Sequence, residues 1–120
     1  MSIAKDEVLA FLNRLRAKIS VYDIIYLDQR PKNAQTLATL EIAPYERDEA
    51  VKSLKVIDYS EGPLAETQHG GETMWVFGKQ IKNEEVYIKV SLGTPNNAVI
   101  CISFHIAEHP MSYPFKRSES

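Results

Sequence analysis

The sequence is poor in cysteine and has no long apolar run, and each absence removes a class of protein. A single cysteine, Cys101, excludes an internal disulfide and a thiolate metal cluster within one chain. It lies in an apolar stretch, residues 99–102, so we expect a buried thiol. The apolar runs are far shorter than the ~20 residues that a membrane span needs, so we expect no membrane partner.

An excess of basic residues is also missing. The chain has 14 Lys and Arg against 16 Asp and Glu, a formal net charge of −2. This excludes a protein that coats nucleic acid by bulk charge, but it is compatible with a local basic groove. The first residues lack the apolar run of a secretory signal, so we expect a cytoplasmic protein.

The length predicts one domain with one core. A chain of 120 residues, 44% apolar and 25% charged, has the size and composition of a single globular unit. No repeat or low-complexity tract interrupts it. We therefore expect a single domain over residues 1–120, with a C-terminal tail from about residue 107.

The first half of the chain predicts helices. Residues 5–20 place apolar side chains at helical spacing, and residues 21–27 are β-branched and aromatic, which suits a short strand or an extended stretch. A short helical segment is expected over 33–40 and a second main helix over 45–54, after a proline that suits a first helical turn. Residues 58–63 contain Gly-Pro and cannot continue this helix, and the segment through 68–71, with His69, is expected to be a loop.

The second half predicts strands. Residues 73–79, 84–92 and 98–106 have strand length and are joined by good turn sequences, so we expect a three-stranded meander. Helices first and sheet afterwards give an α+β fold, with N-terminal helices packed on one face of a small C-terminal antiparallel sheet.

The last two predicted strands can be aligned by requiring that apolar side chains share one face. Pairing Leu92 with Ala98 satisfies this requirement, and the apolar pairs are then Val90 with Ile100, Ile88 with Ile102, and Val86 with Phe104. The other face pairs Lys89 with Cys101, Tyr87 with Ser103, and Glu85 with His105.

In this alignment the polar face carries Tyr87, Lys89 and His105, with His105 a diagonal neighbour of Tyr87 at about 7–8 Å. Gly78 of the preceding strand falls beside Tyr87, which predicts open space above the sheet. Glu85 either orients His105 or is a surface charge. A face of this kind is also typical of any half-solvated antiparallel sheet, so the pattern alone leaves both a functional site and a plain surface open.

A resemblance adds to the pattern. Residues 37–106 contain Thr-Met-Trp at 73–75, Glu-Val-Tyr-Ile-Lys-Val at 85–90 and Ile-Ser-Phe-His at 102–105, in this order. In these segments the chain resembles the MqsR family of toxins from bacterial toxin–antitoxin pairs. The resemblance implies a RelE-like fold and a small mRNA endoribonuclease that inhibits translation until a cognate antitoxin, expected to be a helix-turn-helix protein, neutralises it.

The resemblance also assigns positions. The family's catalytic tyrosine falls on Tyr87, and its C-terminal catalytic lysine, which follows Ser-Phe, falls on His105. Two positions depart from the family: Glu61 stands where it has a lysine, and Val76 where it has a glutamine. The departures leave open an alternative, a catalytically inert RNA- or protein-binding module of the same fold.

Metal-free RNA cleavage needs a base, an acid and a cation or donor at the phosphate. His105 is the expected acid or base, because histidine side chains titrate in the neutral range. Lys89 or Lys79 is expected to neutralise the phosphate, and Tyr87 to donate a hydrogen bond or to stack on a base.

The tail offers further candidates. His109, Lys116 and Arg117 are candidate RNA-binding residues, with a solvated surface as the alternative reading. A metal site built from His105, Glu108 and His109 has only a weak spacing signal. We therefore expect no metal and no cofactor.

Overall fold

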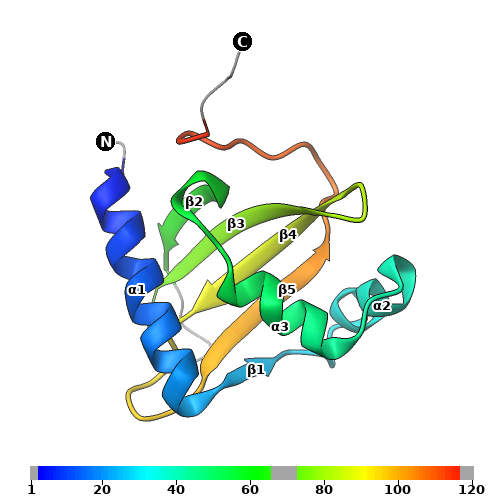
Figure 1. The fold of residues 1–120 in the computed structure, drawn as a ribbon, viewed down its shortest axis with the longest axis horizontal. Coiled ribbons are helices and arrows are strands. Elements are labelled where there is room, and N and C mark those ends of the chain that lie inside the picture. The colour runs from blue at the N-terminus through cyan, green and yellow to red at the C-terminus, as the bar shows by residue number, and fades with distance from the viewer. Residues whose placement is uncertain (1–2, 66–72, 117–120) are drawn as a thin grey trace.

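The computed structural model describes residues 3–65 and 73–116, and over these ranges it is an α+β fold (Figure 1). The expected fold class is therefore confirmed. The elements in chain order are α1 (Lys5–Tyr22), β1 (Ile24–Tyr26), α2 (Pro31–Leu40), α3 (Pro44–Lys52), the short 3-10 helix η1 (Val56–Asp58), β2 (Tyr59–Leu64), β3 (Met74–Ile81), β4 (Glu84–Ser91) and β5 (Val99–Ile106). None of the helices in these ranges is long and apolar enough to cross a membrane.

The sheet is wider than the predicted meander. Its order is β1-β5-β4-β3-β2, so β3, β4 and β5 form the expected antiparallel meander, while β1 adds a parallel edge. Strand β2 adds the other edge, although its Gly-Pro pair was expected to break a strand ladder as well as a helix. That expectation was wrong because an irregular edge strand tolerates the Gly62-Pro63 pair that a central strand would exclude.

Helices α1 and α3 cover one face of the sheet, and the core lies between (Figure 1). The apolar stripe of α1 is buried, and Phe11 of this stripe stacks on Trp75 with ring centroids 4.6 Å apart. Alternate residues of β4, namely Val86, Ile88 and Val90, face the same core and are fully buried. Burial of each such side chain contributes about 1.5–3 kcal/mol, so the orientation of β4 is strongly fixed. The residues between them, including Tyr87 and Lys89, consequently point to the other face.

The register of β4 against β5 differs from the expected one. Tyr87 lies directly opposite His105 and Lys89 opposite Ser103, after which the register shifts and Val90 lies opposite Cys101. Strand β5 thus holds one residue more than β4 between these pairs, a β-bulge at Ile102. The apolar-face requirement could not find this register, because a slip of two residues preserves the faces and alternation does not reveal a bulge. The bulge turns Cys101 into the core, where the expected buried thiol is confirmed.

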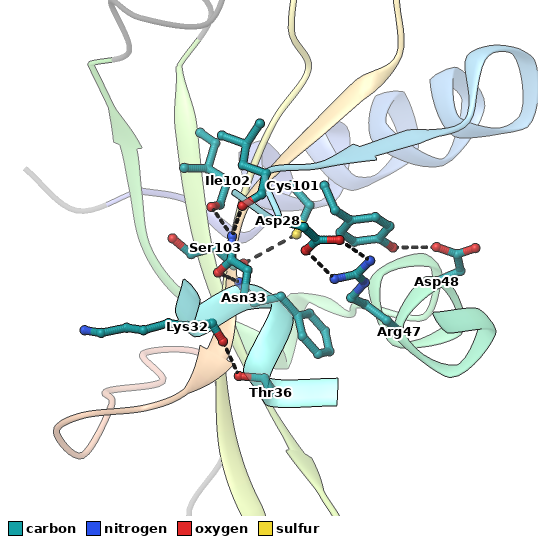
Figure 2. A network of polar contacts seen from close by, with 12 residues as sticks. Asp28, Lys32, Asn33, Thr36, Arg47, Asp48, Cys101, Ile102 and Ser103 are labelled. Atoms are coloured by element: carbon teal, nitrogen blue, oxygen red, sulfur yellow. Dashed lines mark hydrogen bonds and ion pairs between the residues drawn. The ribbon is translucent and has the colours of Figure 1, made fainter. Parts of the chain in front are cut away.

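Asn33 holds the bulge at the edge of β5 (Figure 2). Strand β1 pairs only as far as Cys101, so the next residues of β5 have no neighbouring strand on this side. The buried Asn33 side chain replaces it: Nδ2 donates to the carbonyl of Ile102 at 2.9 Å, and Oδ1 accepts from the backbone N–H of Phe104 at 3.1 Å. Because buried backbone groups need partners, these bonds fix the first turn of α2 against β5.

A second polar network fixes the end of β1 (Figure 2). The buried Arg47 of α3 donates to both carboxylate oxygens of Asp28 at 2.9 and 3.1 Å, and its guanidinium lies 3.6 Å from the centre of the Tyr26 ring. The Tyr26 hydroxyl in turn donates to Asp48 at 2.6 Å. The segment between β1 and α2 is therefore held at Asp28, two residues before Arg30.

Residues 107–116, called the strap here, run back from the end of β5 toward the β2 side of the sheet (orange to red in Figure 1). Glu85 anchors the strap, since its carboxylate accepts from the Tyr113 hydroxyl at 2.6 Å and from the Met111 N–H at 3.3 Å. Tyr113 lies over Gly78, where an added Cβ would be 2.2 Å from the tyrosine oxygen. The expected open space above Gly78 is thus filled, and Glu85 holds the strap rather than facing His105.

Candidate functional site

A cleft of about 1010 Å³ lies on the sheet face that points away from α1 and α3. Its floor is made by alternate residues of the neighbouring strands β4 and β5, namely Tyr87, Lys89, Ser103 and His105. Residues 29–33 line it where α2 begins, residues 60–61 line it from β2, and residues 108–112 of the strap close another side. The polar face predicted from the sequence is therefore the floor of a three-dimensional site.

His105 and Tyr87 form a stacked pair on this floor. The two rings lie 5.1 Å apart at an interplanar angle of 11°, as their direct pairing across the strands allows. Nδ1 of His105 lies 2.9 Å from the carbonyl oxygen of Ile106. Because a carbonyl oxygen only accepts, Nδ1 carries a proton and Nε2 is the atom left for proton transfer.

Tyr87 is a hydrogen-bond donor at neutral pH. Burial raises the pKa of its hydroxyl above the usual value, and the negative charge of Glu61 raises the pKa further. The phenol consequently stays protonated. The Lys89 ammonium lies 5.8 Å from the centre of the Tyr87 ring, so a cation stands beside the stacked pair.

The cleft contains other basic groups, and they differ in their partners. Lys32 forms an ion pair with Glu108 of the strap, and this contact lowers the pKa of the Glu108 carboxyl. Nη1 of Arg30 donates to the carbonyl of Ile102 at 3.1 Å and to the Ser103 hydroxyl at 3.3 Å. Nothing in the sequence pattern indicated Arg30, since only the bulge and the start of α2 bring it to the floor.

Of the other predicted site residues that the structure describes, one lines the cleft and two lie outside it. His109 lines the cleft from the strap. Lys79 does not, because it pairs with the core-facing Val86 and so leaves the polar face; its ammonium is 3.6 Å from Asp58. The Lys116 ammonium lies 5.4 Å from the centre of the Tyr113 ring, away from the cleft lining. Arg117 and the predicted loop at 68–71 with His69 lie outside the described residues.

The two residues that depart from the family pattern, Glu61 and Val76, lie in different surroundings. Glu61 lines the cleft, so it adds a negative charge near Tyr87 where the family has a lysine. Val76 has no exposed surface and offers nothing to a ligand. Within residues 3–65 and 73–116, no group of three His, Cys, Asp or Glu side chains is placed to hold a metal ion.

Comparisons with protein-family models, with curated proteins and with solved structures find no match to the chain. The chemistry that the cleft can support follows from its side chains. It offers an imidazole with one free nitrogen, a protonated phenol, and two basic groups that no carboxylate of the described residues neutralises, Lys89 and Arg30. Ser103 is only 4% exposed, so its hydroxyl is poorly placed as a nucleophile for a large substrate.

Proposed function

We propose that this protein is an endoribonuclease that cleaves RNA in the cleft by acid–base chemistry, as the toxin of a toxin–antitoxin pair. One observation carries the proposal: the His105 imidazole, oriented through Nδ1 and stacked on Tyr87, lies on the cleft floor beside Lys89. The resemblance of residues 37–106 to the MqsR family supports the cellular role. The proposed partners are RNA and a cognate antitoxin.

In the proposed reaction the RNA supplies its own nucleophile. Nε2 of His105 takes the proton of a 2′-hydroxyl, and the 2′ oxygen forms a bond to the adjacent phosphorus. The bond from phosphorus to the 5′ oxygen breaks, leaving a 2′,3′-cyclic phosphate. His109, which lines the same cleft from the strap, supplies the proton to the departing 5′ oxygen.

Charge on the phosphate rises during this step and needs donors already in place. The Lys89 ammonium and the protonated Tyr87 hydroxyl stand beside the imidazole and serve this purpose. No metal is required for any of these transfers, because the nucleophile, the base and the charge stabilisation all come from the RNA and the side chains.

A second candidate function is a catalytically inert RNA- or protein-binding module of the same fold. The observation that favours it is Glu61, which puts a negative charge in the cleft where the family has a cation and so opposes the stabilisation of charge on a phosphate. Only the first candidate breaks a phosphodiester bond.

The test uses the purified chain, labelled RNA and EDTA. We expect wild type to cut RNA and leave cyclic phosphate ends, and His105→Ala to lose about 10²-fold or more in rate, as expected when an acid–base group is removed. Tyr87→Phe should slow cleavage, whereas Tyr45→Phe, at an exposed tyrosine of α3, should not. Intact RNA after incubation with wild type would leave only the inert module, and full activity of His105→Ala would remove this residue from the mechanism.

A cellular experiment tests the role. Expression of the wild-type chain alone should arrest growth and degrade mRNA, and co-expression with a short open reading frame adjacent to its gene should restore growth. The His105→Ala variant should be tolerated without that partner. Healthy cells expressing the active wild-type chain alone would refute the toxin role.

A further inference from the structure

We propose that Arg30 holds the phosphodiester group of the RNA substrate beside His105, an assignment that rests on RNA being the ligand of the cleft. Neither the register of the strands nor the family resemblance indicates this residue. The inference comes from where the guanidinium lies, what holds it, and which of its donors remain free.

The contacts of Arg30 place its guanidinium over the β5 side of the cleft floor, where α2 begins. Nη1 lies 3.3 Å from the hydroxyl of Ser103, which is directly opposite Lys89 in the sheet. Ser103 precedes His105 by two residues on the same strand, so their side chains share a face about 7 Å apart. A guanidinium, an ammonium and an imidazole thus surround one position on the floor, where a phosphate can contact all three.

Arg30 keeps hydrogen-bond donors that no described residue occupies. A guanidinium carries five N–H groups, and the two hydrogen bonds of Arg30 to described residues both use Nη1, which leaves Nε and Nη2 without a partner among them. No carboxylate of the described residues pairs with Arg30, whereas other basic side chains are neutralised: Lys32 by Glu108, Arg47 by Asp28, and Lys79 by Asp58. The planar fork of an unneutralised arginine matches two phosphate oxygens, a geometry that lysine cannot reproduce.

The fold fixes this guanidinium before any substrate arrives. The bidentate contact between Arg47 and Asp28 holds the chain two residues before Arg30, and Asn33 holds it three residues after. The Ile102 carbonyl, which the bulge presents to Nη1, fixes the head group itself. Arg30 is exposed, but these contacts remove part of its side-chain freedom before binding, which favours both affinity and the alignment of the phosphate.

The test measures binding separately from cleavage. The probe is a fluorescein-labelled hexanucleotide of 2′-O-methyl RNA, which cannot be cut because its 2′ oxygens are blocked. Its dissociation constant is measured by anisotropy over a series of salt concentrations for wild type, Arg30→Gln, Arg30→Lys and Arg14→Gln. Arg14 is the matched control, since it is exposed on α1, which covers the opposite face of the sheet.

We expect Arg30→Gln to weaken binding about tenfold, and the slope of log affinity against log salt to become shallower by about 0.7, the value for one phosphate contact of a single strand. Arg30→Lys should keep the salt dependence of wild type but bind more weakly, because lysine keeps the positive charge and lacks the planar guanidinium. Arg14→Gln should match wild type. Circular dichroism and urea unfolding establish that each variant is folded.

The outcomes separate this assignment from the proposed function. If Arg30→Gln and Arg14→Gln bind alike with equal slopes while wild type cleaves RNA, the assignment is overturned and the nuclease stands. If binding depends on Arg30 but unmodified RNA stays intact, the assignment stands and the nuclease is overturned. If wild type does not bind the probe, the assignment is overturned, and the nuclease is overturned as well if unmodified RNA stays intact.

Discussion

Replacing Gly78 with alanine should displace Tyr113 of the strap from the sheet. The backbone of Gly78 is not in the positive-φ region, so it can accept an L-residue. The obstacle is Tyr113, since the three atoms nearest to an added Cβ all belong to this ring, at 2.2, 2.8 and 2.8 Å. One methyl group therefore forces Tyr113 away from the sheet and from Glu85.

The expected change in the free energy of unfolding combines the loss of one hydrogen bond with the effect of alanine on the unfolded chain. The hydrogen bond from Tyr113 to the Glu85 carboxylate contributes about 1.5–3 kcal/mol, the usual range for a bond to a charged group. Replacing glycine by alanine restricts the unfolded chain and so stabilises the folded protein by about 0.4–1 kcal/mol. We expect Gly78→Ala to lower the free energy of unfolding by about 1–2 kcal/mol.

The assay is urea unfolding followed by the fluorescence of Trp75, the single tryptophan, which is buried against Phe11. The decisive comparison repeats Gly78→Ala in a Tyr113→Ala background, where the ring is absent. There the same substitution should stabilise the protein by about 0.4–1 kcal/mol. An equal loss in both backgrounds would refute the argument that Tyr113 is what Gly78 accommodates.

Two further substitutions test the edge of β5 and the charge of the cleft. Asn33→Ala should lower the free energy of unfolding by about 2–4 kcal/mol, because it leaves the N–H of Phe104 and the carbonyl of Ile102 without this buried partner. The control is Asn13→Ala, at an exposed asparagine of α1. A loss no larger than in this control would contradict the role of Asn33. Glu61→Gln should tighten binding of 2′-O-methyl RNA about two- to fivefold by removing a negative charge from the cleft. Unchanged affinity relative to the exposed Glu49→Gln would contradict that effect.

Local patterns were enough to predict most elements. The predicted helices at 5–20, 33–40 and 45–54 correspond to α1, α2 and α3, and the three predicted strands to β3, β4 and β5. Helical spacing and alternation are properties of neighbouring residues, so the sequence displays them directly. The same alternation put Tyr87, Lys89 and His105 on one face, and the structure brings them together in the cleft.

What the sequence could not predict depends on residues far apart in the chain. The bulge at Ile102 changes the partner of Tyr87 without changing any local pattern, and it is stabilised by Asn33, about seventy residues earlier. Arg30 reaches the floor by the same route. Gly78 was recognised as a gap, but that Tyr113 fills it follows from the path of the strap, which no periodicity encodes.

The strand order also bears on how the protein is made by the ribosome. Strand β5 is synthesised after the other four, yet it lies between β1 and β4. Until β5 has emerged, β1 has no partner and β4 presents an open row of backbone groups, the kind of edge that recruits other chains. The floor of the cleft also takes two residues from β5, Ser103 and His105. An interrupted translation product that ends before β5 would therefore be prone to aggregation and would lack the cleft altogether.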